Sequence, residues 1–324
     1  MFAEAIDDLL QNQCSPAVVR AIEAGGSSLS LWQAVEASGF LELLAPEADG
    51  GAALALPDLF PILVSFGRFA VPVPVAQTIV ARALLASQAM PRGMVTLAAA
   101  LHREPAGALC CPLTPYGMLA DYILAQEGDA LLLLPAALAT REATGVHRSL
   151  AATLRWPDER QATRLPGAGA RLRAFVAAVH AAMLSGAMNR VLEMTLQYCN
   201  DRLQFGKSLG KFQAVQHQLS IMAEHTAAAS IASEAAFRTD ASTPSLLAAA
   251  IAKSRTSEAA ALVASIAHAL HGAIGVTEEY DLQLLTRRLH EWRMAHGSEA
   301  YWNKLVGERV LESDLPLVDF VRSV

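Results

Sequence analysis

Hydrophobic positions recur at helical spacing through roughly the first ninety residues, in segments that Gly and Pro separate. Ser15 followed by Pro16 is typical of an N-cap and a first helical position, and Gly25 and Gly26 are typical of a helix end. A second helix is predicted over residues 31–38. The pattern therefore predicts an N-terminal unit built of helices.

The pattern changes between about Val95 and Arg164, where short apolar runs alternate with Gly, Pro and Asp. Such runs predict a few strands, and A-L-L-L-L-P at residues 130–135 predicts a buried one. A further apolar stretch, from Leu56 to the Pro-rich residues 71–75, precedes this region. The middle of the chain is therefore predicted to be a small β unit.

From Leu172 onward the hydrophobic spacing is helical again. The first helix of this region places Phe175, Val179 and Ala182 on one recurrent face. Gly186 shares that face and permits close approach by another helix. This helix is predicted to lie in the core of a helical bundle.

The later helices of the bundle are predicted from their start signals. One runs over about residues 212–238. The next covers residues 244–271, with Thr243 as its N-cap and a Pro at its first position. Thr277 is predicted to cap another helix, because two glutamates follow it and favour a helix N-terminus. A last helix is predicted to begin at Ser298.

Composition adds an expectation about assembly. Of the 324 residues, 53% are hydrophobic and only 17% are charged. The excess is mostly Ala and Leu at helical spacing, which predicts helices packed on several sides and a substantial subunit interface. We found no uninterrupted apolar run of about eighteen residues, so no membrane insertion is predicted.

Charge and cysteine content exclude several classes of function. The formal net charge is −6 and no Lys/Arg stripe is present, so nucleic acid is not a predicted partner. The four cysteines show no C-x-x-C spacing, which favours a reducing compartment over a disulfide framework. The first residues are acidic where an export signal would be basic, so a cytoplasmic location is predicted.

Two segments carry candidate chemistry. Residues 202–217 read R-L-Q-F-G-K-S-L-G-K-F-Q-A-V-Q-H, and residues 271–282 read H-G-A-I-G-V-T-E-E-Y-D-L. A guanidinium such as that of Arg202 can bind two phosphate oxygens with its planar fork, and a Gly-rich segment lets phosphates approach backbone N–H groups. Together the segments resemble the C-terminal domain of the acyl-CoA dehydrogenases, flavoenzymes that oxidise the α,β bond of acyl-CoA thioesters.

A third segment strengthens the resemblance, with a Gly-x-x-x-x-x-x-Pro-Glu pattern closing in Gly-Gly at Gly39, Pro46, Glu47, Gly50 and Gly51. The resemblance implies an α+β, mainly α fold. Its parts are an N-terminal helical domain (residues 1–92), a small middle β domain (93–168) and a C-terminal four-helix bundle with the flavin and subunit contacts (169–324). It also implies an oxidoreductase of acyl-CoA or fatty acid catabolism.

The resemblance implies FAD as the cofactor and a shared site. Arg202 would contact the pyrophosphate of an FAD held by a neighbouring subunit, with Phe205 and Gln213 approaching the adenosine side. A homo- or hetero-oligomer, dimer or tetramer, follows, with an acyl-CoA substrate and an electron-transfer flavoprotein or another acceptor as partners. The implied FAD contacts are Arg202, Gln204, Phe205, Phe212, Gln213, Gly272, Ala273 and Ser298.

The chain departs from the family pattern at several positions. Ala273 stands for a second Gly, and Ala269 for a Gln whose loss removes a polar contact to the cofactor. The Thr-Glu-Pro…Gly-Ser and Trp-Ile-Thr/Ser motifs, which line one side of the flavin ring in the family, could not be placed in this sequence. The middle β domain is therefore predicted to be reduced.

Dehydrogenation needs a positioned acceptor for the α-proton while a hydride leaves the β-carbon. The family's Tyr-Glu-Gly-Thr segment falls without a gap on residues 295–298, so His296 replaces the catalytic Glu and Ser298 the Thr. Some relatives carry their Glu on the first bundle helix, at a position that is Val176 here. His180, one turn further, is interpreted as a core residue.

The role of His296 stays open between two interpretations. A neutral imidazole can act as the base near physiological pH. Alternatively, His296 fills the pocket of a non-catalytic or half-site subunit, and a Glu-bearing partner completes the enzyme. A third interpretation is a flavin-free helical scaffold.

Other side chains are interpreted structurally. Trp292, together with Arg287 and Arg288, predicts a packed, ion-paired helix end, and Trp302 belongs to the same group. Three further histidines show no metal-ligand spacing with a nearby acidic residue, so no metal site is predicted. They are His217, His268 and His271.

Overall fold

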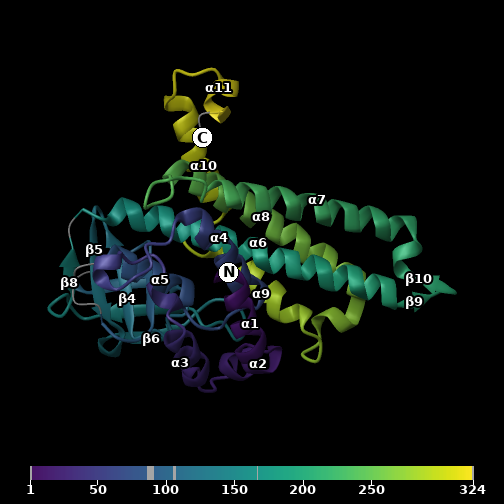
Figure 1. The fold of residues 1–324 in the computed structure, drawn as a ribbon, viewed down its shortest axis with the longest axis horizontal. Coiled ribbons are helices and arrows are strands. Elements are labelled where there is room, and N and C mark those ends of the chain that lie inside the picture. The colour runs from purple at the N-terminus through teal and green to yellow at the C-terminus, as the bar shows by residue number, and fades with distance from the viewer. Residues whose placement is uncertain (1, 86–90, 105–106, 166, 323–324) are drawn as a thin grey trace.

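The structure of the chain, a computed structural model, describes residues 2–85, 91–104, 107–165 and 167–322. Helices form both ends of the chain and two small sheets form the middle (Figure 1). Ser15 caps its helix as predicted, since its Oγ accepts a hydrogen bond from the Val18 N–H. The N-terminal helices are α1 (Phe2–Gln13), α2 (Pro16–Glu23), α3 (Leu29–Ala37), α4 (Leu56–Arg68) and α5 (Val75–Leu84).

Two four-stranded sheets make up the described part of the middle region. The predicted buried strand is β5 (Ala130–Pro135), in which every residue but the last is buried. In the first sheet the parallel pair β1 (Val95–Ala98) and β4 (Tyr122–Glu127) is followed by antiparallel β5 and β8 (Thr163–Leu165). The second sheet is antiparallel, in the order β2 (His102–Arg103), β3 (Leu109–Thr114), β7 (Ala152–Trp156) and β6 (Thr140–Ala143).

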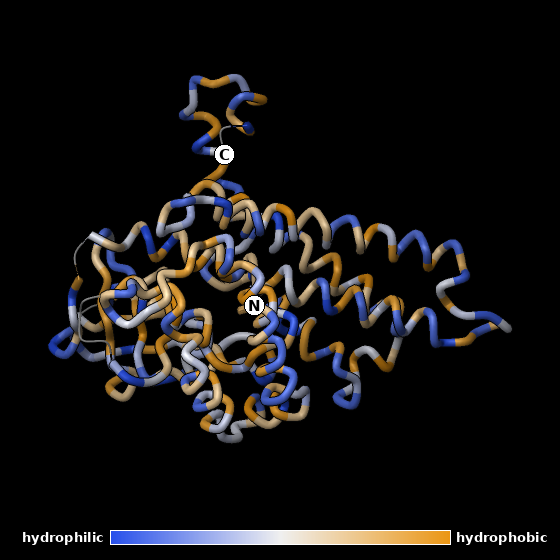
Figure 2. The backbone as a smooth tube through the Cα atoms, in the orientation of Figure 1, coloured by the Kyte–Doolittle hydropathy of each residue, from blue (hydrophilic) through white to orange (hydrophobic). Residues whose placement is uncertain are grey.

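The C-terminal region is a helical bundle around α6 (Gly169–Asp201), which contacts α4, α7, α8 and α9. A hairpin links α6 to α7 at the far end of the bundle, where Figure 2 shows mainly hydrophilic positions. The last helix, α11, projects away from the rest of the molecule (Figure 1). The elements after α6 are β9 (Leu203–Gln204), β10 (Lys207–Ser208), α7 (Gln213–Ala235), α8 (Leu246–His271), α9 (Leu282–Met294), α10 (Glu299–Glu312) and α11 (Leu317–Arg322).

The start of α8 differs from the prediction. The helix begins at Leu246 with Ser245 as its N-cap, because the Ser245 Oγ accepts from the backbone N–H three residues on. The Thr243 hydroxyl instead accepts a hydrogen bond from Arg171 Nε at 3.1 Å. Thr243 is therefore not the N-cap, and Pro244 lies before the helix.

The start of α9 was also predicted too early. Residues Gly272–Val276 form a 3-10 turn, here called η6, which closes directly before Thr277. The Thr277 Oγ1 donates backward to the Ile274 carbonyl at 2.8 Å, so it does not cap a following helix. The helix begins at Leu282 instead, with Asp281 at the N-cap position.

The crossing of α4 and α6 depends on two glycines. A Cβ at Gly186 would overlap the carbonyl oxygen of Val64, and a Cβ at Gly67 would overlap that of Met183. Each glycine thus lies against the backbone of the opposite helix, which only a residue without a side chain allows. The predicted close approach at Gly186 is confirmed.

Two segments of the bundle, α6 and α8 extended through η6 (Leu246–Val276), are long and apolar enough by length and composition to cross a membrane. In this structure 83% of the apolar window of α6 is buried inside the molecule, and 44% of that of α8. Core helices that are apolar on several sides pass the same test. The absence of membrane insertion stays a prediction.

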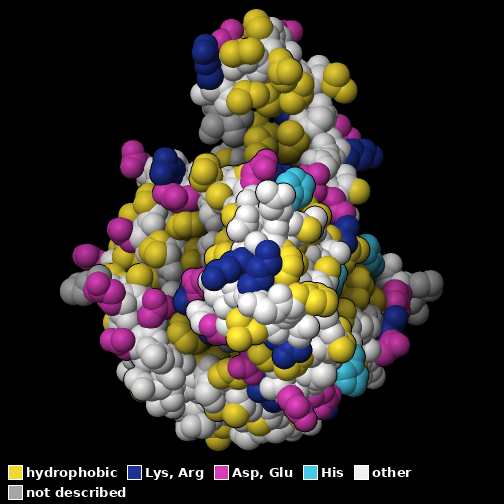
Figure 3. Space-filling view, turned by 90° about the vertical axis from the view of Figure 1, so that its right-hand side faces the viewer, with side chains coloured by type: hydrophobic (Ala, Val, Ile, Leu, Met, Phe, Trp, Pro, Cys, Tyr) yellow, Lys and Arg dark blue, Asp and Glu magenta, His cyan; other side chains and the backbone are white. Residues whose placement is uncertain are grey.

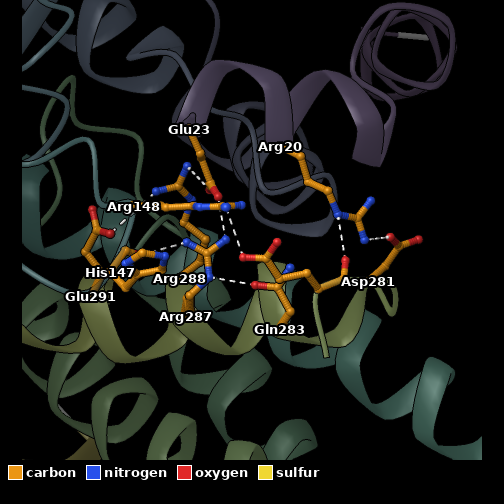
Figure 4. Close-up of polar contacts among 10 residues, drawn as sticks. Arg20, Glu23, His147, Arg148, Asp281, Gln283, Arg287, Arg288 and Glu291 are labelled. Carbon is orange, nitrogen blue, oxygen red and sulfur yellow. Dashed lines mark hydrogen bonds and ion pairs between the residues drawn. The ribbon is translucent and has the colours of Figure 1, made fainter. Parts of the chain in front are cut away.

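Ion pairs join the three regions of the chain (Figure 4). Glu23, at the end of α2, is buried between two arginines of α9, with N–O distances of 2.5 Å to Arg287 and 2.9 Å to Arg288. Arg287 also donates to the His147 carbonyl in the middle region at 3.0 Å. Arg288 and Trp292 are buried, so the predicted packed, ion-paired helix end is confirmed.

Candidate functional site

His296 lies in the turn between α9 and α10, in a left-handed backbone conformation with φ of 57°. Its ring meets that of His180 on α6 edge-to-face, with 4.8 Å between centroids and 73° between planes. The Ala99 N–H, just after β1, points to His296 Nδ1 at 3.5 Å. His180 is fully buried, as a core residue should be, but it also contacts the predicted catalytic position.

Backbone partners decide which nitrogen of each ring carries the proton. His180 Nδ1 lies 2.9 Å from the Val176 carbonyl, which only accepts, so this nitrogen is protonated and Nε2 carries the lone pair. In His296, Nδ1 accepts from Ala99, so the proton of the neutral ring is on Nε2. Both Nε2 atoms are buried and lack a hydrogen-bond partner within the described residues.

Burial lowers the pKa of both imidazoles. The pKa of His180 falls to about 3, chiefly through desolvation and then through the charge of Lys253. The pKa of His296 lies well below 6.5, again chiefly through desolvation, with His180 and Lys253 adding to the effect. Both rings are therefore neutral at physiological pH and resist protonation. Since the lone pair of His296 faces a backbone amide, this side chain is a weak proton acceptor in this arrangement.

Lys253 on α8 is a residue of this site that the sequence analysis did not identify. It is fully buried, and its Nζ donates to the Arg293 carbonyl (2.8 Å), the Ser257 Oγ (2.9 Å) and the Gly297 carbonyl (3.2 Å). It thus holds both ends of the turn that carries His296. Desolvation lowers the pKa of Lys253 to about 7. A single lysine in an Ala-rich helix of a buried bundle was the available signal.

The predicted FAD contacts of the first motif lie on the β9–β10 hairpin and the start of α7. Phe205 is 91% exposed and left-handed, with φ of 51°. Its ring lies 6.3 Å from that of Phe212, in a T-shaped arrangement, and the Lys207 Nζ lies over the Phe212 ring at 4.3 Å. Gln204 is half-buried and Gln213 exposed. The hairpin therefore presents aromatic surface beside positive charge.

The hairpin end carries unneutralised positive charge. Arg202, Lys207 and Lys211 are exposed there, and within the described residues none of them has a carboxylate partner. Figure 3 looks onto this end of the molecule and shows Lys and Arg side chains at the centre of the face. Three cations, one in the hairpin and one on either side of it, suit a pyrophosphate, which carries negative charge and several acceptor oxygens.

The second motif lies at the same end of the bundle. Tyr198, in the last turn of α6, donates through its hydroxyl to the His271 carbonyl at 3.2 Å and stacks on the His271 ring. Gly272 follows with φ of 65°, and both Gly272 and Ala273 are exposed. Tyr198 thus joins the start of η6 to the end of α6 from which the hairpin leaves.

The predicted site residues separate into two groups. Ser298 is the N-cap residue of α10 and follows the His296 turn, far from the hairpin. His180 and Arg202 are separated by twenty-two positions along and just past α6, or about 33 Å at roughly 1.5 Å per residue. The ribityl chain that joins a flavin ring to its pyrophosphate is far shorter than this. One chain therefore cannot offer Arg202 and the His296 turn to the same FAD.

Metal-ligating groups do not gather at either place. No group of three or more His, Cys, Asp or Glu side chains in the described ranges could hold a metal ion. His268 Nε2 lies 2.9 Å from Thr286 Oγ1, and His271 Nδ1 lies 2.8 Å from the Ala267 carbonyl. These contacts tie both histidines to the bundle.

The sequence of the chain is similar to known proteins of one family. Residues 174–311 match the family of the acyl-CoA dehydrogenase C-terminal domain. The chain is 32% identical over 298 residues to acyl-CoA dehydrogenase IpdE2 of Mycolicibacterium smegmatis, covering 90% of this chain and 91% of that protein. It is 31% identical to IpdE2 of Mycobacterium tuberculosis, with 90% of each chain covered.

Solved structures share the fold. The ChsE4–ChsE5 complex from Mycobacterium tuberculosis matches with a TM-score of 0.84 and 20% identity, covering 97% of both chains. Butyryl-CoA dehydrogenase from Megasphaera elsdenii matches with a TM-score of 0.76 and 17% identity, covering 96% of this chain and 97% of that one. These matches confirm the predicted mainly α fold with a helical bundle and a small sheet region. By sequence and fold, the chain belongs to the acyl-CoA dehydrogenase family of oxidoreductases.

Proposed function

We propose that this chain is one subunit of a two-chain, FAD-dependent acyl-CoA dehydrogenase, and that a differently sequenced, glutamate-bearing partner supplies the base. The observation that carries the proposal is the tautomer of the neutral His296 ring, in which the Nδ1 lone pair faces the Ala99 N–H and Nε2 holds the proton. The second buried imidazole, His180, resists protonation as well. A chain without a competent acceptor needs one from elsewhere to remove an α-proton.

The chain's own contribution would come from the hairpin end. Bound FAD supplies the hydride acceptor. Arg202, Lys207 and Lys211 would hold its pyrophosphate by charge and hydrogen bonds, while Phe205 and Gln213 approach the adenosine side. Because this end is about 33 Å from the chain's own His296 turn, the flavin ring would lie in the neighbouring chain.

Relatives support the two-chain arrangement. The structure with a TM-score of 0.84 is a complex of two differently named chains, ChsE4 and ChsE5. The relatives at 31% and 32% identity are named acyl-CoA dehydrogenases. A cytoplasmic location and an electron-transfer flavoprotein or another acceptor remain part of the proposal. The four cysteines are buried and unpaired, which suits a reducing compartment.

A comparison of the chain produced alone and together with its genomic neighbour tests this function. We expect the isolated chain to lack dehydrogenase activity, and the co-produced complex to be yellow and to lose its visible flavin absorbance anaerobically with an acyl-CoA. Replacement of Arg202 by Ala should lower the FAD content of the complex. An isolated chain that turns over acyl-CoA at ordinary rates would contradict the half-site proposal.

A second candidate is a self-sufficient dehydrogenase with His296 as base, favoured by the neutral imidazole at the family's base position. It predicts that the isolated chain is active and that His296→Gln abolishes flavin reduction while FAD stays bound. His180→Gln is the matched variant, since it removes the neighbouring imidazole but keeps His296. Equal flavin reduction in wild type and His296→Gln would exclude His296 as the base.

A further inference from the structure

The ring of His271 lies where the proposed FAD contacts converge. It belongs to the last residue of α8, directly before η6. It stacks on Tyr198 with 4.4 Å between centroids and 24° between planes, and the Tyr280 ring lies 5.3 Å away. The Tyr198 carbonyl accepts the Arg202 N–H at 2.9 Å. His271 therefore packs on a residue one helical turn before the cation predicted to bind pyrophosphate.

His271 has one hydrogen-bonding atom left over. Its Nδ1 lies 2.8 Å from the Ala267 carbonyl, so Nδ1 carries the proton and Nε2 is a lone-pair acceptor. The residue is 3% exposed, and Nε2 is buried with no hydrogen-bond partner in the described part of the chain. A buried acceptor without a donor is destabilising, so a bound group that brings a donor would be favoured here.

The groups around His271 indicate which donor this is. A pyrophosphate at Arg202 carries adenosine on one side, whose ribose hydroxyls and adenine amino group are hydrogen-bond donors a few bonds from the phosphates. Gly272 and Ala273, which follow His271, are exposed, so this end of the chain is open to a ligand. The side chain of Ala269, three residues before Gly272, offers no hydrogen bond. Two histidine nitrogens here, His268 Nδ1 and His271 Nε2, are buried without a partner in the described residues, and His268 Nδ1 faces the buried Gly275.

We propose that His271 Nε2 accepts a hydrogen bond from the adenosine part of FAD. The inference rests on the proposed function, because it needs FAD at the hairpin end. The Tyr198 ring holds the imidazole plane by stacking, and the Tyr198 hydroxyl holds the His271 backbone at 3.2 Å. The histidine would thus add a polar contact directly before the exposed Gly272 and Ala273.

Matched variants of the complex with its partner test the contact through FAD affinity rather than activity. His271→Phe keeps an aromatic ring for stacking but removes the acceptor, and His271→Gln keeps an acceptor. We expect the Phe variant to raise the FAD dissociation constant roughly tenfold, measured by quenching of flavin fluorescence. The Gln variant should lose less, and His102→Phe, at an exposed position of β2 outside the proposed FAD contacts, should change nothing.

Nitrogen NMR of the wild-type complex gives an independent measurement if the Phe variant does not fold. With FAD or with ADP alone as probe, the Nε2 resonance of His271 should shift as it accepts a hydrogen bond. An unchanged resonance, or unchanged FAD affinity in a folded His271→Phe complex, overturns the inference. If Arg202→Ala lowers FAD affinity and His271→Phe does not, only this inference fails. If neither does, FAD does not bind at this end and the proposed function fails as well.

Discussion

At the scale of single residues, Lys253 shows how one side chain sets the geometry of the His296 turn. Its ammonium has three acceptors: two turn carbonyls and the Ser257 hydroxyl. The nearby carboxylate of Glu299 is bound to Arg293 rather than to the lysine. A neutral amine could donate to both carbonyls and accept from the hydroxyl. This explains how the fold tolerates a lysine with a pKa of about 7.

The lowered pKa of Lys253 predicts a pH dependence of stability. The pKa is about 7 in the folded chain against an ordinary 10.5. Between these values the unfolded chain binds more protons, so wild-type stability rises with pH, by up to about 1.4 kcal/mol per pH unit. Below pH 7 the amine is protonated in both states and this slope vanishes.

The measurement compares wild type with Lys253→Met by urea unfolding between about pH 6 and 9. The difference in free energy of unfolding should be constant up to the folded pKa and then change in favour of wild type. Lys304→Met, at an exposed position of α10, should show no such trend. If the free energies of unfolding of wild type and Lys253→Met change in parallel with pH, the Lys253 amine is not buried as the structure has it.

At the scale of elements, the α4–α6 crossing carries much of the contact between the N-terminal helices and the bundle. It depends on backbone contact at Gly67 and Gly186. We expect Gly186→Ala to lower the free energy of unfolding by about 1–3 kcal/mol. The added Cβ overlaps the Val64 carbonyl oxygen, so α4 and α6 must move apart.

Gly307→Ala is the matched control for this crossing. Gly307 lies within α10, and a Cβ there meets no atom. This variant should be neutral or more stable, by up to about 0.5–1 kcal/mol, since alanine restricts the unfolded chain. If the two substitutions change the free energy of unfolding equally, in thermal or urea unfolding, then α4 and α6 are not in backbone contact at Gly186.

At the scale of the whole molecule, the ion pairs of Glu23 tie the N-terminal helices to α9, and Arg287 extends the link to the middle region (Figure 4). Glu23→Gln should destabilise the protein by up to about 3–5 kcal/mol, because it removes the buried carboxylate that Arg287 and Arg288 share and leaves Arg288 only the longer pair with Glu291, at 3.5 Å. Glu234→Gln, in an exposed pair with Arg238, should cost less than about 1 kcal/mol.

A double-mutant cycle separates the pair from the surroundings. Arg288→Met combined with Glu23→Gln should cost less than the sum of the single changes, since no buried charge of the pair is left alone. Additive free energies of unfolding would show that Glu23 and Arg288 act independently. The link between α2 and α9 would then depend on packing and on the other ion pair of Glu23, with Arg287.

Local patterns were sufficient for the larger elements of the fold. Periodicity located the long helices, and the run at residues 130–135 located β5, because side-chain spacing follows backbone geometry. The start of α8 was missed because Arg171, seventy-two residues away from Thr243, occupies the threonine hydroxyl. The start of α9 was missed because Thr277 closes a preceding turn. The domain limits after residues 92 and 168 stay predictions, as do the roles of the predicted site residues.

Family membership, the missing glutamate at position 296, the Arg- and Gly-containing motif at 202–217 and the Gly-containing motif at 271–282 are properties of the amino-acid sequence. The tautomer and the low pKa of His296 depend instead on contacts from Ala99 and His180, which lie far away along the chain. The same holds for the burial of Lys253 and for the separation of the FAD contacts into two groups. The sequence specifies which chemical groups are present. The tautomer and pKa of a side chain, and the distance between two binding groups, depend on which atoms the fold brings together and on how much water it excludes.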